Sequence, residues 1–173
     1  DRIYRISRDW NLRYKRWMVE SHHRKGALLD FGCGTGEFLA EMRANGWQVT
    51  GVEPAAQARA VAEGLGVRAS ADLEGCDGPY DVITLWHVLE HVHEAAGQFR
   101  RLCELLTPGG ILVMALPNIG SVDSRAYGAN WVALDAPRHL FHFRPQDVRR
   151  FAVARGLTPA GGGVLPLDTP YNV

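Results

Sequence analysis

The sequence predicts an α/β fold built on a doubly wound, mostly parallel sheet, preceded by an N-terminal helix. Short apolar runs alternate with helical stretches of about 10 to 15 residues, a pattern that indicates right-handed crossovers and a sheet covered on both faces. The first such run meets a glycine-rich turn that leads into a helix. The chain has 173 residues, of which 46% are hydrophobic and 22% charged, and this composition excludes disorder and coiled coil.

The N-terminal helix is expected from residue 7 to about 24, with Ser7 as its cap. Trp10, Tyr14 and Trp17 are spaced to share one face, which we expect to pack on the sheet. The expected strands cover residues 27–31, 48–52, 67–69, 80–85, 111–116 and, interrupted by glycines, 157–165. The expected later helices cover residues 37–45, about 55–65, about 93–106 and 144–155.

We divide the chain into an N-terminal helical cap, residues 1–25, and a main domain, residues 26–173. Residues 117–143 have no clear periodicity, and a connection of that length is usually functional. Residues 1–25 hold eight basic against three acidic side chains, while the rest hold 11 against 16. Such a basic segment can touch nucleic acid or anionic lipid, but a solvated helix face is the favoured interpretation.

A cytosolic protein is the expectation, because no apolar run approaches the roughly 20 residues of a membrane span and the first residues lack the apolar core of a signal peptide. The three cysteines, Cys33, Cys76 and Cys103, show no metal-type or redox-type spacing and are expected to be reduced thiols.

The glycine turn and an acid that follows the second strand predict a nucleoside site. Gly32, Gly34 and Gly36 provide bare backbone at the carboxyl end of the first strand, where ligands bind in open parallel sheets. Glu53 ends the second strand, where a carboxylate can accept hydrogen bonds from both ribose hydroxyls. Asp30 and Glu37 flank the turn and would repel a pyrophosphate, so a ligand with an amino group and a positive centre fits better than a dinucleotide.

These motifs resemble those of class I S-adenosylmethionine-dependent methyltransferases. Residues 28–36, Leu-Leu-Asp-Phe-Gly-Cys-Gly-Thr-Gly, are similar to that family's first motif, and residues 52–54, Val-Glu-Pro, to its second-strand acid. Residues 80–83 with 89–92, and residues 106–112, look like its fourth- and fifth-strand motifs. The nearest subgroup is the small-molecule methyltransferases related to ubiquinone-biosynthesis enzymes.

The resemblance implies S-adenosyl-L-methionine as the cofactor. It assigns the methionine portion to the turn from Asp30 to Gly36, the ribose to Glu53, and the adenine to the loop after the third strand. The backbone near Leu85 and Trp86 would face the cofactor amino group. The residues expected to bind the cofactor are Asp30, Gly32, Cys33, Gly34, Gly36, Glu53, Pro54, Asp72, Leu73, Leu85, Trp86 and His91. The family's sheet ends with an antiparallel seventh strand, and we expect it to be missing here because residues 166–173 are a poor strand, which leaves an edge that a second copy can cover.

Residues 87–91, His-Val-Leu-Glu-His, match a signature of inverted zinc proteases, in which the two histidines bind zinc and the glutamate acts as base. That site also needs a third ligand, typically a downstream glutamate, and the sequence contains none after Glu104. We therefore expect no metal. Instead, His91 is placed beside the cofactor, Glu90 in a structural bond and His93 in solvent.

The acceptor side is expected in residues 117–143. His139 is the first candidate for a general base or acceptor ligand and His142 the second, although both can equally hydrogen-bond the loop to the body. Arg138 can bind an acceptor anion or pair with Asp135.

We thus expect methyl transfer to an oxygen, carbon or nitrogen atom of a small-molecule acceptor, with nucleic acid disfavoured as a substrate. Two alternatives remain open: a non-catalytic nucleoside-binding or regulatory module, and an RNA ribose methyltransferase.

Overall fold

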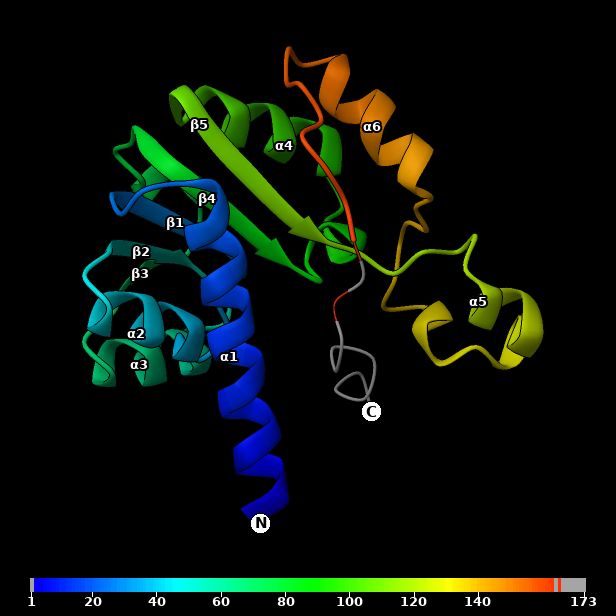
Figure 1. Cartoon of the computed structure of the whole chain (residues 1–173), viewed down its shortest axis with the longest axis horizontal. Helices are drawn as coiled ribbons and strands as arrows, with labels where there is room; N and C mark the ends of the chain where they lie inside the picture. Colours follow the sequence, from blue (N-terminus) through cyan, green and yellow to red (C-terminus); the bar gives the residue numbers. More distant parts are fainter. Residues whose placement is uncertain (1, 164, 166–173) are drawn as a thin grey trace. The chain divides into compact units, whose positions relative to one another are not determined.

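The computed structural model describes residues 2–163 and residue 165, and it contains a five-stranded sheet (Figure 1). The strand order is β3-β2-β1-β4-β5, as expected for a doubly wound sheet whose chain starts in the middle and reverses direction once. The strands are β1 Ala27–Phe31, β2 Gln48–Val52, β3 Arg68–Ser70, β4 Tyr80–Trp86 and β5 Leu106–Ala115.

Central strand β1 pairs in parallel with β2 and β4, and β2 pairs in parallel with β3. Leu28 lies opposite both Val49 and Val82, which fixes the register of the three central strands. Because the strands are parallel, their carboxyl ends meet at one edge of the sheet.

The helices occupy the connections between strands and the C-terminal part of the chain. The α-helices are α1 Arg2–His22, α2 Glu37–Ala44, α3 Ala56–Gly64, α4 Ala95–Glu104, α5 Val122–Tyr127 and α6 Pro145–Val153. The part of the chain that the structure describes also has single turns of 3-10 helix, η1 Leu73–Gly75, η2 Leu89–His91, η3 Gly128–Asn130 and η4 Val132–Leu134. Within the described residues no helix combines the length and apolar character needed to cross a membrane.

The chain divides into two compact units. The first comprises residues 1–86 and 101–114, and the second comprises residues 87–100 and 115–173. In the first unit, Val19 of α1, Phe38 of α2 and Ala62 of α3 share one buried cluster with sheet residues such as Leu28 and Val82. Helices α1, α2 and α3 therefore all contribute to the core on one face of the sheet.

The second unit has a smaller core of its own. Phe99 of α4 is fully buried, and its ring lies 4.6 Å from that of Phe151 of α6, centroid to centroid. The guanidinium of Arg155 lies over the Phe151 ring at 3.9 Å, which adds a cation–π contact. A backbone hydrogen bond of 3.0 Å from Ile119 to Phe143 joins the two ends of the long connection.

The N-terminal helix differs from expectation in its start and in its buried face. It begins at Arg2, because residues 2–6 contain no glycine or proline, and Ser7 lies inside it rather than capping it. Trp10 and Tyr14 do share a face, with stacked rings 5.3 Å apart, but Trp10 and Trp17 are 46% and 60% exposed. The helix packs through Val19 instead of through its aromatic side chains.

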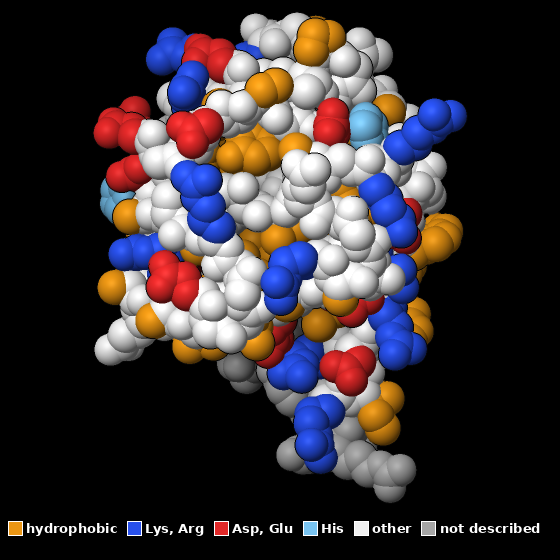
Figure 2. Space-filling view, turned by 90° about the vertical axis from the view of Figure 1, so that its left-hand side faces the viewer, with side chains coloured by type: hydrophobic (Ala, Val, Ile, Leu, Met, Phe, Trp, Pro, Cys, Tyr) orange, Lys and Arg blue, Asp and Glu red, His pale blue; other side chains and the backbone are white. Residues whose placement is uncertain are grey.

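The basic character of α1 is partly balanced by acids of α2. Arg8 pairs with Glu37 at 2.8 Å, and Arg16 pairs with Glu41 at 3.0 Å. On the face drawn in Figure 2, blue and red side chains are interspersed. The N-terminal charge excess therefore includes arginines used to join two helices.

The fifth and sixth strands also differ from expectation. Strand β5 begins at Leu106, five residues earlier than predicted. It includes the Thr-Pro-Gly-Gly segment, which had been expected to precede the strand. The predicted sixth strand at residues 157–165 does not form in its described part, where Pro159 and the run Gly161–Gly162–Gly163 interrupt the pattern. Residues 166–173, where no strand was expected, lie outside the described residues.

Candidate active site

The glycine turn follows β1 at the carboxyl edge of the sheet and is fixed by backbone hydrogen bonds. The amides of Gly32 and Cys33 both donate to the carbonyl of Val52, at 2.7 and 3.0 Å. Gly34 and Gly36 have φ angles of +54° and +76°, which side-chain-bearing residues rarely adopt. A Cβ at Gly36 would lie 2.6 Å from the Cβ of Ala62, whereas one at Gly34 would meet nothing within 4 Å. Gly36 therefore permits helix packing, and Gly34 presents bare backbone to open space.

The carboxylate of Glu53 is held beside this turn by two backbone amides. Its Oε2 accepts a hydrogen bond of 3.0 Å from Gly34, and its Oε1 accepts one of 2.9 Å from Ala55. The side chain is half-buried, and each carboxylate oxygen has a second lone pair. Glu53 is thus oriented to accept two further hydrogen bonds, while the adjacent Pro54 is exposed.

Asp30 lies at the end of β1 and is almost fully buried, with 2% exposure. Burial raises the pKa of its carboxyl group from 3.8 to about 7, against the opposing effects of a hydrogen bond from Thr84 and the charge of Lys15. The hydroxyl of Thr84 donates to Asp30 Oδ1 at 2.6 Å. A bound cation would stabilise the ionised form, so this carboxyl group is suited to an amino-group ligand.

Cys33 is buried inside the turn, where its surroundings disfavour the thiolate form of its side chain. Desolvation, followed by the charges of Asp30 and Glu53, raises the pKa of its thiol to about 12. A raised thiol pKa disfavours the thiolate form that a nucleophilic role for Cys33 would need. Its Sγ lies 2.5 Å from where a Cβ at Gly51 would stand, so the side chain fills space between β2 and the turn.

The loop after β3 contains Asp72 and Leu73, the expected adenine contacts. Asp72 Oδ1 accepts hydrogen bonds from the amides of Glu74 and Gly75, at 3.1 and 3.3 Å, and so caps η1. Leu73 is buried, with 4% exposure. The structure therefore gives Asp72 a local capping role, while its adenine contact stays a prediction.

At the end of β4, Leu85 is fully buried and Trp86 is half-buried. The Trp86 ring packs edge-on against Phe38, with centroids 5.4 Å apart, and the ammonium of Lys15 lies 4.7 Å from its centroid. Its indole Nε1 is buried without a hydrogen-bond partner among the described residues. A buried unpaired donor is costly, so this N–H indicates a place for a ligand acceptor atom.

The residues of the first unit fit S-adenosyl-L-methionine. Gly34 leaves open space beside the turn, Glu53 offers oriented acceptors for ribose hydroxyls, and Asp30 offers a carboxyl group for an amino group. Glu37, expected to repel phosphate near the site, is instead paired with Arg8.

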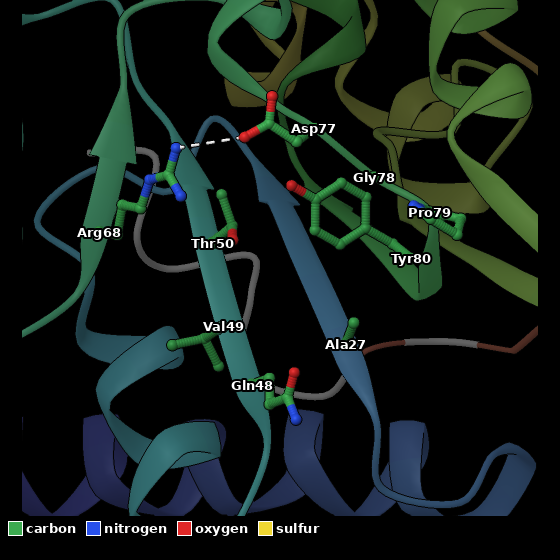
Figure 3. A pocket seen from close by; sticks show the side chains of 9 residues that line it. All are labelled: Ala27, Gln48, Val49, Thr50, Arg68, Asp77, Gly78, Pro79 and Tyr80. Carbon is green, nitrogen blue, oxygen red and sulfur yellow. Dashed lines mark ion pairs between the residues drawn. The ribbon is translucent and has the colours of Figure 1, made fainter.

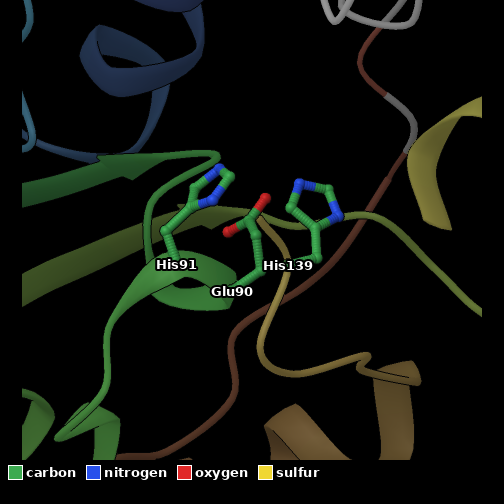
Figure 4. Close-up of side chains that lie close together, drawn as sticks. All are labelled: Glu90, His91 and His139. Carbon is green, nitrogen blue, oxygen red and sulfur yellow. The ribbon is translucent and has the colours of Figure 1, made fainter. Parts of the chain in front are cut away.

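His91, the remaining expected cofactor residue, lies in the second unit with the histidines of the long connection. Its Nδ1 bonds the carbonyl of Arg138 at 3.0 Å, and its ring centroid lies 4.6 Å from that of His139. His139 is buried, with 6% exposure, and its Nδ1 bonds the carbonyl of Ala133 at 2.9 Å. The structure thus brings His91 and His139 together (Figure 4).

Glu90 was expected to make a structural bond, and Arg138 to bind an anion or to pair with Asp135. The backbone carbonyl of Glu90, rather than its side chain, makes structural hydrogen bonds, accepting from the amides of Leu140 and Phe141 at 2.8 and 3.3 Å. Arg138 pairs with Asp135 at 2.8 Å, one of the two uses considered for it.

His142 is exposed and is held by its Nε2, which lies 2.9 Å from the carbonyl of Leu134. Its ring centroid lies 6.1 Å from that of His139. Both histidines therefore hydrogen-bond within residues 117–143 rather than to the body of the protein, and each keeps one ring nitrogen for other chemistry.

A surface hollow in the first unit lies away from these residues. It is lined by residues at the amino ends of the strands, including Ala27, Gln48 and Tyr80, and crossed by an ion pair of 3.6 Å between Arg68 and Asp77 (Figure 3). This is the edge opposite the glycine turn.

Sequence reasoning missed Thr84 and Lys15, which both act on Asp30. A hydroxyl residue in the otherwise apolar centre of β4 was a usable signal for Thr84. Nothing in the sequence connects Lys15 of α1 with Asp30.

Comparison with known proteins relates this geometry to a family. Residues 4–160 match the family model described as a methyltransferase domain. A ubiquinone biosynthesis O-methyltransferase of Burkholderia thailandensis is 30% identical over 159 residues, covering 82% of this chain and 68% of that protein. One of Caulobacter vibrioides is 30% identical over 164 residues, covering 84% of this chain and 63% of the relative.

Among solved structures, magnesium protoporphyrin IX methyltransferase from Synechocystis PCC 6803 with bound SAH superposes with a TM-score of 0.73 at 18% identity. The match covers 92% of this chain and 77% of that one. At this identity the likeness concerns the fold.

Proposed function

Because this chain belongs to the class I S-adenosylmethionine-dependent methyltransferases, we propose that it transfers a methyl group from S-adenosyl-L-methionine to a hydroxyl oxygen of a small molecule. Oxygen, carbon and nitrogen were all expected as possible accepting atoms. We choose oxygen because the relatives are named O-methyltransferases. The observation that carries the cofactor assignment is the Glu53 carboxylate, fixed by the amides of Gly34 and Ala55 beside an open glycine turn.

The cofactor residues act by binding and orientation. Glu53 accepts the two ribose hydroxyls, and Gly34 lets the ligand approach the backbone. Asp30 receives the amino group, with Thr84 orienting its carboxyl. The other proposed contacts are Gly32, Cys33, Gly36, Pro54, Asp72, Leu73, Leu85, Trp86 and His91.

Bound S-adenosyl-L-methionine supplies an activated methyl group, so the protein needs only to align the acceptor, exclude water and accept the hydroxyl proton. We assign the acceptor side to residues 117–143 and its chemistry to His139, with His142 as second candidate. A carbonyl only accepts, so Nδ1 of His139 carries the proton donated to Ala133. In the neutral ring, Nε2 then keeps a lone pair for a proton or a ligand.

We further propose a cytoplasmic enzyme in which residues 1–25 form a cap on the main domain, 26–173, and nucleic acid is not a substrate. The ion pairs that join arginines of α1 to acids of α2 support the proposal that nucleic acid is not a substrate, since a nucleic-acid surface requires unpaired cations. A homodimer through an exposed sheet edge is part of the same proposal and is checked by sedimentation of the purified chain.

The test is a panel assay for S-adenosylhomocysteine formation with simple phenols, catechols, amines and an RNA oligonucleotide. We expect turnover with hydroxyl acceptors, and loss of turnover in Glu53→Gln but not in Glu63→Gln, an exposed glutamate of α3. Turnover with amines alone would contradict oxygen as the acceptor. Turnover on RNA would support the ribose methyltransferase instead, and cofactor binding without turnover on any acceptor would favour the non-catalytic module.

A further inference from the structure

The proposed methyl transfer uses His91 and His139 singly, but it does not account for the cluster that the two histidines form with Glu90. Each offers one ligand atom, and these three atoms all lie within 4.8 Å of one another. Figure 4 shows the Glu90 carboxylate between the two imidazole rings. His139 is 48 residues from His91 and 49 residues from Glu90 in the chain, and all three lie in the second unit.

The Glu90 carboxylate is the first reason to expect a cation. The residue is 1% exposed, and both carboxylate oxygens are buried without a hydrogen-bond partner among the described residues. His87 Nδ1 lies 3.6 Å from Glu90 Oε1, which is ion-pair distance for a protonated ring but beyond hydrogen-bond distance. Burying a carboxylate without hydrogen bonds is strongly unfavourable, so the arrangement needs a positive partner at these oxygens.

The two imidazoles supply the second reason. Nδ1 of His91 contacts the carbonyl of Arg138, and Nδ1 of His139 contacts that of Ala133. Since a carbonyl only accepts, each Nδ1 carries the proton, and the neutral rings keep their lone pairs on Nε2. Metal-binding histidines typically donate their other ring N–H to a backbone carbonyl in this manner, which fixes the tautomer and the orientation of the ring.

The backbone holds the cluster together. The carbonyl of Glu90 accepts hydrogen bonds from Leu140 and Phe141, the two residues after His139. The amide of His139 donates to the carbonyl of Asp135 at 3.0 Å, and Asp135 Oδ2 lies 3.8 Å from His139 Nε2. His91 is exposed while the other two are buried, so a bound ion would be open to solvent on one side.

We propose that Glu90, His91 and His139 bind a divalent transition-metal ion of the zinc class. Two neutral imidazoles with one carboxylate suit zinc and its neighbours, whereas magnesium prefers an all-oxygen set. Three protein ligands leave a coordination position for water or another oxygen ligand, as in catalytic zinc sites.

The ligand set differs from that of the zinc-protease signature. There the histidines equivalent to His87 and His91 would bind and Glu90 would act as base; here Glu90 is a ligand and His139 replaces His87. His139 takes part as a ligand, one of the two capacities considered for it above. The expectation of no metal rested on a missing downstream glutamate, and a downstream histidine fills that place.

The test is titration of the chelator-treated full chain with Zn²⁺ by calorimetry, and with Co²⁺ by its visible absorption, both without cofactor or acceptor. We expect one ion per chain, a spectrum typical of nitrogen and oxygen ligands, and no displacement by excess Mg²⁺. The variants Glu90→Gln, His91→Asn and His139→Asn should each weaken binding by more than about 100-fold, beyond the 10- to 100-fold typical of changes around a metal's direct ligands.

The matched control is His93→Asn, an exposed histidine two residues from His91 and outside the cluster, which should bind as the wild type does. A second control is the double variant His22→Asn/His23→Asn, because the exposed His22 at the end of α1 and the half-buried His23 next to it can hold zinc adventitiously. Binding lost in that double variant and retained in His139→Asn would overturn the proposal, as would the absence of binding in the wild type. Because no cofactor is present, failure of metal binding leaves the proposed methyl transfer standing, and failure of methyl transfer leaves metal binding standing.

Discussion

Asp30 should make the protein less stable as the pH rises through neutrality. Its pKa is 3.8 as an ordinary carboxyl group and about 7 in the fold, because burial penalises the charged form. Between these two values the folded chain holds a proton that the unfolded chain has released, so the free energy of unfolding falls with increasing pH. Each pH unit in that window contributes about 1.4 kcal/mol, and the effect is complete above the folded pKa.

The substitution Asp30→Asn removes this dependence. The amide oxygen can still accept the hydrogen bond from Thr84, which preserves the local geometry. Between pH 5 and pH 8 wild-type stability should fall relative to the variant by about 2 to 3 kcal/mol, from the two pH units that lie below the folded pKa.

The assay is urea denaturation of both proteins at pH 5 and pH 8 without ligand. Taking the difference between the proteins cancels the titration of the histidines that they share. Asp123→Asn, an exposed aspartate of α5, serves as the control and should follow the wild type at both pH values. A difference between wild type and Asp30→Asn that stays constant from pH 5 to pH 8 would refute the reasoning, because it would mean that Asp30 does not titrate in this range.

Two further predictions concern the cofactor half of the site. Glu53→Gln should raise the dissociation constant for S-adenosyl-L-methionine, measured by calorimetry, by about 10- to 100-fold, the loss expected for a charge-assisted hydrogen bond. Glu63→Gln should leave it unchanged, and equal affinities in the two variants would contradict the ribose role of Glu53. Gly34→Ala should lower the free energy of unfolding by about 1 to 2 kcal/mol because of its left-handed backbone, and Gly36→Ala should lower it further because its Cβ would meet Ala62. Equal losses in chemical denaturation would show that the protein moves Ala62 away from the new Cβ.

The sheet was predictable because local patterns determine it. The strands at 27–31 and 48–52 were predicted with the bounds that the structure gives, since each is an apolar run with turn residues on both sides. The run at 157–165 was also predicted as a strand, but it is broken by Pro159 and three glycines, which deprive a strand of hydrogen bonds and side-chain packing. The start of α1 was missed because the rule used for it was a capping residue, and Ser7 sits within a sequence that is helix-compatible on both sides.

The site was predictable only where its residues are close in sequence. The glycine turn and Glu53 could be read from the ends of two adjacent strands, and the structure joins them through a single hydrogen bond. The partners of Asp30, by contrast, come from β4 and α1, and the approach of His139 to Glu90 depends on how residues 117–143 fold. A contact between such distant segments follows from tertiary packing, which cannot be predicted from the pattern of a single sequence.

The most direct test of the cofactor site is a crystal structure of the chain with S-adenosylhomocysteine. We predict that both ribose hydroxyls donate to the Glu53 carboxylate and that the ligand passes over Gly34, at the carboxyl edge of the sheet. A ligand bound instead in the hollow at the opposite edge, beside Arg68 and Asp77, would contradict the account.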